Sequence, residues 1–177
     1  MGGPTAEERA LVQRFLSHRD EYAFRALYRR HTPMLYRIAY RMVPRSAAEI
    51  VQDTWISAIQ KLAEFRWESS LSTWLVGIAI NRSREEIRRL RARPANAAQE
   101  FAIDAPPIAD RLDLERALAK LADGYREILL LHDVEGYTHE EIAQALEIEA
   151  ATSRSQLARA RAALRELLGK SRCCNDR

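Results

Sequence analysis

The residues best suited to chemistry lie in two expected helices near the C-terminus. The first runs over Thr138–Leu146, and after a tight turn the second carries Arg154, Arg159 and Arg161. Guanidinium groups spaced along a helix hydrogen-bond phosphate oxygens and guanine edges, which lysine does less well. The pattern therefore indicates a helix-turn-helix that reads a nucleic-acid groove.

The charge of the chain reverses across this segment. Residues 112–149 hold ten acidic and three basic side chains, a net charge of −7, whereas residues 150–177 hold seven basic and two acidic, a net of +5. The acidic residues 112–149 repel phosphate, so nucleic acid is attracted only to the basic helix that follows them. This fixes the orientation in which the segment binds.

A second basic segment precedes residue 94. Residues 82–93 contain six arginines against two glutamates, and they follow a connector region rich in aromatic residues, with Phe65, Trp67 and Trp74. Rings that stack on bases, beside arginines that track phosphate, suit unpaired nucleic acid, although a charged run also occurs on solvated helices. Trp74 fits the apolar stripe of a core, and Trp67 is the better candidate for stacking.

Enzymatic and metal-dependent functions have little support. The four histidines (His18, His31, His132 and His139) are scattered, and neither a glycine-rich phosphate loop nor a nucleophile triad is present. We expect no catalytic residue, cofactor, metal or small-molecule substrate. Cys173 and Cys174 fit two free thiols near the C-terminal end, with a metal or redox role as the alternative.

The composition is that of a globular helical protein. Of 177 residues, 47% are apolar and 30% charged, glycine and proline number six each, and the net charge is +3. The absence of a long apolar run predicts no membrane span, and the N-terminus lacks the order of a signal peptide, so we expect a cytoplasmic protein.

Apolar spacings of three and four predict helices throughout the first half. A short helix is expected near Glu7–Leu16, and a longer one over Phe24–Met42 that Pro33 should kink or restart. Ser46 and Glu49 form a capping-box pattern for the next helix, and Ser72 is the expected cap of the helix that carries the arginines.

The predicted fold is all-α, with two small helical domains joined by a flexible linker. We expect an N-terminal domain over residues 1–91 with a net charge of +6, a proline-containing linker over 92–111, a C-terminal domain over 112–170 and a tail over 171–177. In the C-terminal domain, helices are expected over Leu112–Leu121 and Ile128–Val134, Gly136 as a helix stop, and a capping box from Thr138 to Glu141.

These residues resemble the extracytoplasmic-function sigma factors, the small alternative specificity subunits of bacterial RNA polymerase. The resemblance rests on Ala48–Trp55, on Phe65–Asn81 and, in the second domain, on Arg126–Leu131, Glu140–Ala143 and Thr152–Arg161. The two motif sets occur in the family's order, separated by a linker.

The resemblance implies the partners of each domain. Core RNA polymerase would be bound by Glu49, Ile50, Gln52, Asp53 and Trp55. The minus-ten promoter element, including its melted non-template strand, would be bound by Arg66, Trp67, Ser69, Ser70, Asn81, Arg84, Arg88 and Arg89. The minus-thirty-five duplex would be bound by Ala151, Thr152, Arg154, Ser155 and Arg159. An anti-sigma protein would hold the factor inactive.

Several positions depart from the family pattern. Glu147 stands where the turn usually has glycine, which costs about 1 kcal/mol if the backbone there is left-handed. Ala151, Ser153 and Gln156 also differ, and Trp67 stands where a small residue is common.

Two other classes of protein remain as alternatives. A stand-alone helix-turn-helix regulator would explain residues 138–168 but leaves Glu49–Trp55 without a role, and such regulators commonly dimerise on two half-sites. A helical adaptor would be favoured only if the arginines do not contact DNA.

Overall fold

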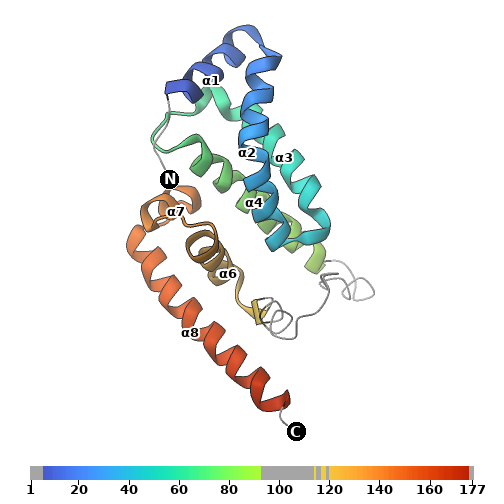
Figure 1. Cartoon of the computed structure of the whole chain (residues 1–177), viewed down its shortest axis with the longest axis vertical. Coiled ribbons are helices and arrows are strands. Elements are labelled where there is room, and N and C mark those ends of the chain that lie inside the picture. Colours follow the sequence, from blue (N-terminus) through green and yellow to red (C-terminus); the bar gives the residue numbers. More distant parts are fainter. Residues whose placement is uncertain (1–5, 93–113, 115–116, 119, 176–177) are drawn as a thin grey trace. The chain divides into compact units, whose positions relative to one another are not determined.

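The computed structural model describes residues 6–92, 114, 117–118 and 120–175, and this part of the chain contains helices and no strand. It divides into two compact units (Figure 1). The first contains α1–α4, and the second contains α6, η4, α8 and most of α7. The all-α prediction with two helical parts is therefore confirmed.

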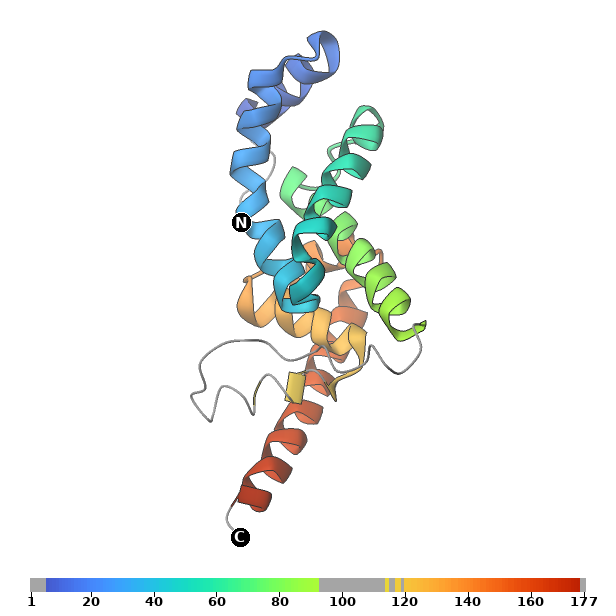
Figure 2. The ribbon, with the colours of Figure 1, turned by 90° about the vertical axis from the view of Figure 1, so that its right-hand side faces the viewer.

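The N-terminal unit packs three long helices around one apolar core. α2 (Glu21–Met42), α3 (Ala47–Lys61) and α4 (Leu71–Ala92) lie against one another, and α1 (Ala6–His18) packs on α2 (Figures 1 and 2). The short 3-10 turns η1 (Pro44–Ser46) and η2 (Leu62–Glu64) stand at the two ends of α3. Fully buried aliphatic side chains fill the centre, including Leu27, Leu35, Ile38, Leu75 and Ile80.

α2 begins at a strong cap and continues through its proline. Asp20 Oδ1 accepts hydrogen bonds from the N–H groups of Tyr22 and Ala23, at 2.9 and 3.2 Å. Arg14 of α1 binds the other carboxylate oxygen, and the Ala23 N–H, followed by Arg14, lowers the pKa of Asp20. Pro33 lies inside α2 and does not restart it, because Leu35, Ile38 and Ala39 beyond it are buried on the same face as Leu27.

Two of the expected helix caps are wrong. Ser46 makes no cap bond to α3; its hydroxyl donates instead to Glu86 Oε1 of α4 at 2.8 Å. α4 begins at Leu71 and is capped by Ser70, whose Oγ accepts from the Thr73 N–H at 3.0 Å, so the cap lies two residues before Ser72. Ser46 is thus bound by a neighbouring helix, whereas the cap of α4 comes from the residue directly before its start.

The helix-turn-helix predicted near the C-terminus is confirmed. α6 (Asp123–Leu129) passes into a π-helical turn, η4 (Leu130–Val134), followed by α7 (His139–Leu146) and α8 (Ala150–Asn175). Gly136 adopts φ +74°, as a helix stop requires, and Ile128, Leu131 and Ile142 are fully buried. Half of the residues of the helix predicted over Leu112–Leu121, and the linker except for Ala92, lie outside the described residues.

Candidate protein and nucleic-acid interfaces

α3 presents one polar face to solvent and buries the other. Ala48, Glu49, Gln52, Asp53 and Ile56 are exposed at helical spacings, with Ile56 at 47% exposure. A stripe of this kind, apolar at Ile56 and acidic at Glu49 and Asp53, is suited to contact another protein.

Two of the five residues assigned to polymerase binding are part of the core instead. Ile50 is 3% exposed and Trp55 is 7% exposed. The Trp55 indole packs against Phe24 and Tyr28, with ring centroids 5.6 and 5.3 Å away, and its N–H donates to Thr32 Oγ1 at 3.0 Å. Trp55 therefore holds α3 against α2, whereas Glu49, Gln52 and Asp53 are exposed.

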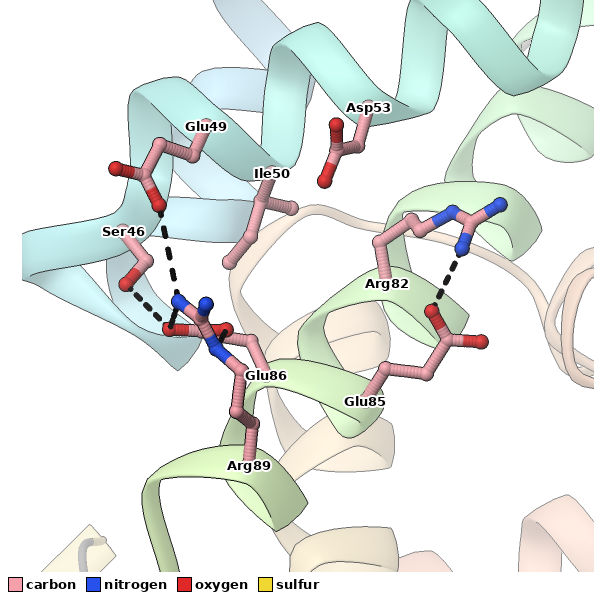
Figure 3. A pocket seen from close by; sticks show the side chains of 8 residues that line it. All are labelled: Ser46, Glu49, Ile50, Asp53, Arg82, Glu85, Glu86 and Arg89. Atoms are coloured by element: carbon pink, nitrogen blue, oxygen red, sulfur yellow. Dashed lines mark hydrogen bonds and ion pairs between the residues drawn. The ribbon is translucent and has the colours of Figure 1, made fainter. Parts of the chain in front are cut away.

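Charged side chains join α3 to α4 in a pocket (Figure 3). The Arg89 guanidinium lies 2.6 Å from Glu86 and 3.9 Å from Glu49. Hydrogen bonding to Glu86 raises the pKa of Arg89 above its ordinary value. Arg82 donates to Ser57 of α3 at 2.7 Å and to Glu85 at 2.7 Å. Arg89, expected to contact DNA, is therefore engaged with carboxylates between the two helices.

The other residues of α4 that were predicted to bind DNA, Asn81, Arg84 and Arg88, lie on its outer face. Asn81 and Arg88 are exposed, Arg84 is half-buried, and Arg84 donates to Asn81 Oδ1 at 3.3 Å. Positions 81, 84 and 88 follow one helical face, whereas Arg89 is rotated by about 100° from Arg88. The structure thus separates neighbouring arginines that the sequence alone grouped together.

The connector between α3 and α4 holds a cluster of three aromatic rings. The Phe65 centroid lies 4.8 Å from Trp67 and 4.8 Å from Trp74. Trp74 is half-buried against Phe65 and is not a core residue, which corrects the expectation for it. Trp67 is also half-buried, and its backbone has φ +61°.

The polar residues of the connector divide into two kinds. Arg66 is exposed, and Ser69 donates to the Ser70 carbonyl at 3.3 Å. The Ser70 hydroxyl caps α4 and lies 2.8 Å from Thr73 Oγ1, so it supports the helix start. Arg66 and Trp67 are the connector groups best placed to meet a ligand.

The helix-turn-helix is built around a confirmed capping box. The Thr138 N–H donates to Glu141 Oε2 at 2.9 Å, and the Glu141 N–H donates to Thr138 Oγ1 at 3.2 Å. Glu147 in the turn adopts φ +55°, the left-handed conformation for which a strain cost was predicted. The turn is closed by the Ile148 N–H, which donates to the Ala143 carbonyl at 3.0 Å.

α8 exposes the predicted duplex-reading residues at its N-terminal end. Ala151, Arg154, Ser155 and Arg159 are exposed, and Thr152 is half-buried. Arg154 is paired with Glu140 of α7 at 2.8 Å, a bond between exposed side chains that DNA phosphates would compete for. Arg159 has no partner among the described residues, so it presents its charge to solvent.

Several arginines have acidic partners, not all of which the sequence indicates. Arg161 is held by Asp133 at 2.5 and 3.0 Å, and this hydrogen bonding lowers the pKa of Asp133. The charge counts over residues 82–93 and 112–149 include Glu86, Glu140 and Asp133 but do not pair them with particular arginines. The spacing of Glu86 and Arg89, an i,i+3 pair on one helix, was a usable signal in the sequence. Asp133 and Arg161 are 28 residues apart, so the sequence holds no signal for their pairing.

Two histidines that are separated in the sequence meet in this unit. The rings of His132 and His139 are stacked with centroids 4.6 Å apart, and His139 Nδ1 lies 3.0 Å from Ser153 Oγ. Burial, followed by the charge of His132, lowers the pKa of His139.

No group of three or more potential metal ligands occurs in the part of the chain that the structure describes. Among those residues, no helix has the length and apolarity to cross a membrane.

Comparison with known proteins places both units in one class. Residues 27–93 match the sigma-70 region 2 family, and residues 111–164 match sigma-70 region 4. The two regions in this order define a sigma-70-type protein.

Relatives and solved structures narrow the class. The ECF RNA polymerase sigma factor SigM of Mycobacterium tuberculosis is 34% identical over 160 residues, covering 85% of this chain and 79% of SigM. CnrH, solved in complex with the cytosolic domain of CnrY, is 27% identical with a TM-score of 0.71, covering 93% of this chain and 98% of CnrH. RpoE of Bartonella quintana, solved with the anti-sigma factor NepR, is 28% identical with a TM-score of 0.66, covering 82% of this chain and 96% of RpoE. The chain belongs to the extracytoplasmic-function sigma factors.

Proposed function

We propose that this protein is an alternative sigma factor that binds core RNA polymerase through the exposed face of α3 and directs transcription to specific promoters. The observation that carries the proposal is the presence of both sigma-70 regions in one chain, together with the solvent-facing Glu49, Gln52 and Asp53. A stand-alone DNA-binding regulator has no use for that face.

The DNA contacts are divided between the two units. The melted non-template strand of the minus-ten element would meet Arg66 and Trp67 of the connector, Ser69, and Asn81, Arg84 and Arg88 of α4. Ser70 and Arg89 would support this surface indirectly, since their side chains are engaged by Thr73 and Glu86. Bases stack on aromatic rings while arginines track phosphate, a combination that favours unpaired strands.

The upstream duplex would be read by the N-terminal end of α8. Ala151, Thr152, Arg154, Ser155 and Arg159 occupy the place where a recognition helix contacts base edges and phosphates. Glu140 holds Arg154 before binding, and phosphate would take over that bond.

We infer further that the protein is held inactive by an anti-sigma factor and acts in the cytoplasm, without catalytic chemistry of its own. Support for the inhibitor comes from RpoE, which was solved bound to the anti-sigma factor NepR.

We propose a domain over residues 1–91, a linker over 92–111, a second domain over 112–170 and a tail over 171–177. The matched regions 27–93 and 111–164 support this division.

Run-off transcription with core RNA polymerase and a pool of genomic fragments tests the proposal. The chain should yield discrete transcripts that core polymerase alone does not give. Gln52→Arg on the α3 face should weaken polymerase binding about tenfold, as a central interface residue does. Gln13→Arg, which places the same charge on exposed α1, is the matched control. Duplex binding without any association with polymerase would identify a stand-alone regulator and refute the proposal.

A further inference from the structure

An arginine from α1 lies against the aromatic cluster of the connector. Arg9 Cζ is 5.1 Å from the centroid of the Trp67 ring, and Trp67 in turn packs on Phe65 and, through it, on Trp74. A guanidinium at this distance from an indole is attracted by the ring quadrupole. The cluster is therefore a series of three rings with a cation at one end.

Trp67 has a backbone conformation that needs such support. Its φ of +61° lies in the left-handed region, which is unusual for a bulky residue. A conformation of that kind persists only where surrounding contacts impose it. The ring contacts that hold Trp67 come from Phe65 within the connector and from Arg9 outside it.

Arg9 differs in its surroundings from the next arginine of the same helix. Arg14 is bound to the Asp20 carboxylate at 2.5 Å, whereas Arg9 has no carboxylate partner among the described residues. Arg9 also precedes residues 27–93, the part that matches sigma-70 region 2, so the family pattern assigns it no role.

We propose that Arg9 is a positioning residue for promoter specificity: it covers one face of the Trp67 indole and fixes the ring that meets an unstacked base of the minus-ten element. The inference rests on the proposed function of the connector and deepens it. Because Arg9 acts through Trp67, it should influence the choice of base at one promoter position and leave the rest of recognition unchanged.

A promoter library with a randomised minus-ten element tests this, transcribed by holoenzyme made with the full chain. Transcripts from wild type and from Arg9→Ala are sequenced and base preferences compared position by position. We expect Arg9→Ala to change the preference at one position by about two- to fivefold, which corresponds to the strength of an exposed cation–π contact. Arg9→Lys keeps a cation and should restore most of the preference. Arg14→Ala removes the same charge from α1 and should leave every preference as in wild type.

The double variant Arg9→Ala/Trp67→Ala separates positioning from a general effect. Its preferences should equal those of Trp67→Ala alone, because Arg9 has no ring left to hold. An unchanged profile for Arg9→Ala, a uniform fall at all positions, or additive effects in the double variant would each overturn the inference. Wild type that yields no promoter-specific transcripts would instead overturn the proposed function, and the inference with it.

Discussion

The turn of the helix-turn-helix holds a strained residue whose replacement should stabilise the protein. Glu147 follows the last residue of α7 with φ +55°, and the N–H of Ile148 bonds back to the Ala143 carbonyl at 3.0 Å. This is the arrangement of a Schellman helix end, in which glycine is usual at the left-handed position. Because Glu147 is exposed, its side chain loses no packing when it is removed.

The size of the effect follows from two opposing terms. A left-handed conformation costs an L-residue roughly 1–2 kcal/mol, and glycine gives back about 0.5–1 kcal/mol in greater entropy of the unfolded chain. Glu147→Gly should therefore raise the free energy of unfolding of the C-terminal unit by about 0.5–1 kcal/mol. Glu147→Asn should give a smaller gain, and Glu147→Ala should give none, because alanine keeps the strain and removes only the charge.

Amide hydrogen exchange of α7 and α8 is the suitable measurement. The three tryptophans of the chain, Trp55, Trp67 and Trp74, lie outside α7 and α8, whereas the amides of these two helices report directly on the turn between them. Glu147→Gly should slow exchange through unfolding of the C-terminal unit about two- to fivefold, at roughly 1.4 kcal/mol per tenfold. Equal slowing by Glu147→Ala would refute the reasoning, since it would assign the effect to the carboxylate charge and not to the backbone.

Three further predictions concern the arginines and a buried histidine. Arg88→Ala should reduce open-complex formation more than polymerase binding, whereas Arg89→Ala should reduce both, as measured by permanganate footprinting and by pull-down with core polymerase; equal effects of the two variants would contradict this. Arg159→Ala should lower the salt slope of upstream-duplex binding by about one unit, while Arg161→Ala, whose side chain is held by Asp133, should change it less in the same salt titration. His31 is 5% exposed, and burial lowers its pKa below the ordinary value of 6.5, so the unfolded chain takes up the proton first as the pH falls. Stability of the N-terminal unit, followed by tryptophan fluorescence in urea, should therefore be complete above pH 6.5 and decline below it, and His31→Gln should remove that decline.

Features set by neighbouring residues in the chain could be predicted from the sequence. The Thr138–Glu141 capping box, the left-handed Gly136 and the left-handed position of Glu147 depend on backbone groups no more than a turn away. The helix order followed equally well from the spacing of apolar residues, because that spacing already encodes which face each helix buries.

Features that depend on a distant partner could not be predicted. Ser46 was expected to cap α3, but its hydroxyl donates to Glu86, which lies 40 residues further along the chain. Phe24, Tyr28 and Thr32 surround Trp55, and the position of Trp55 in its motif does not show these contacts. Pro33 was expected to kink or restart its helix because propensity is local, whereas burial on both sides of it keeps α2 continuous.

The bonds between α3 and α4 change how variants of the arginine-rich helix should be interpreted. Arg89 with Glu86 and Glu49, and Arg82 with Ser57, tie the expected polymerase-binding helix to the expected DNA-binding helix. A substitution at Arg89 therefore disturbs both surfaces, and parallel loss of polymerase binding and of promoter opening is its expected result. Arg88, one position earlier, is exposed and has no partner among the described residues, so we expect its replacement to affect DNA contact alone. It follows that Arg88, and not the Arg88–Arg89 pair, is the position at which DNA contact by α4 can be tested without altering the polymerase surface.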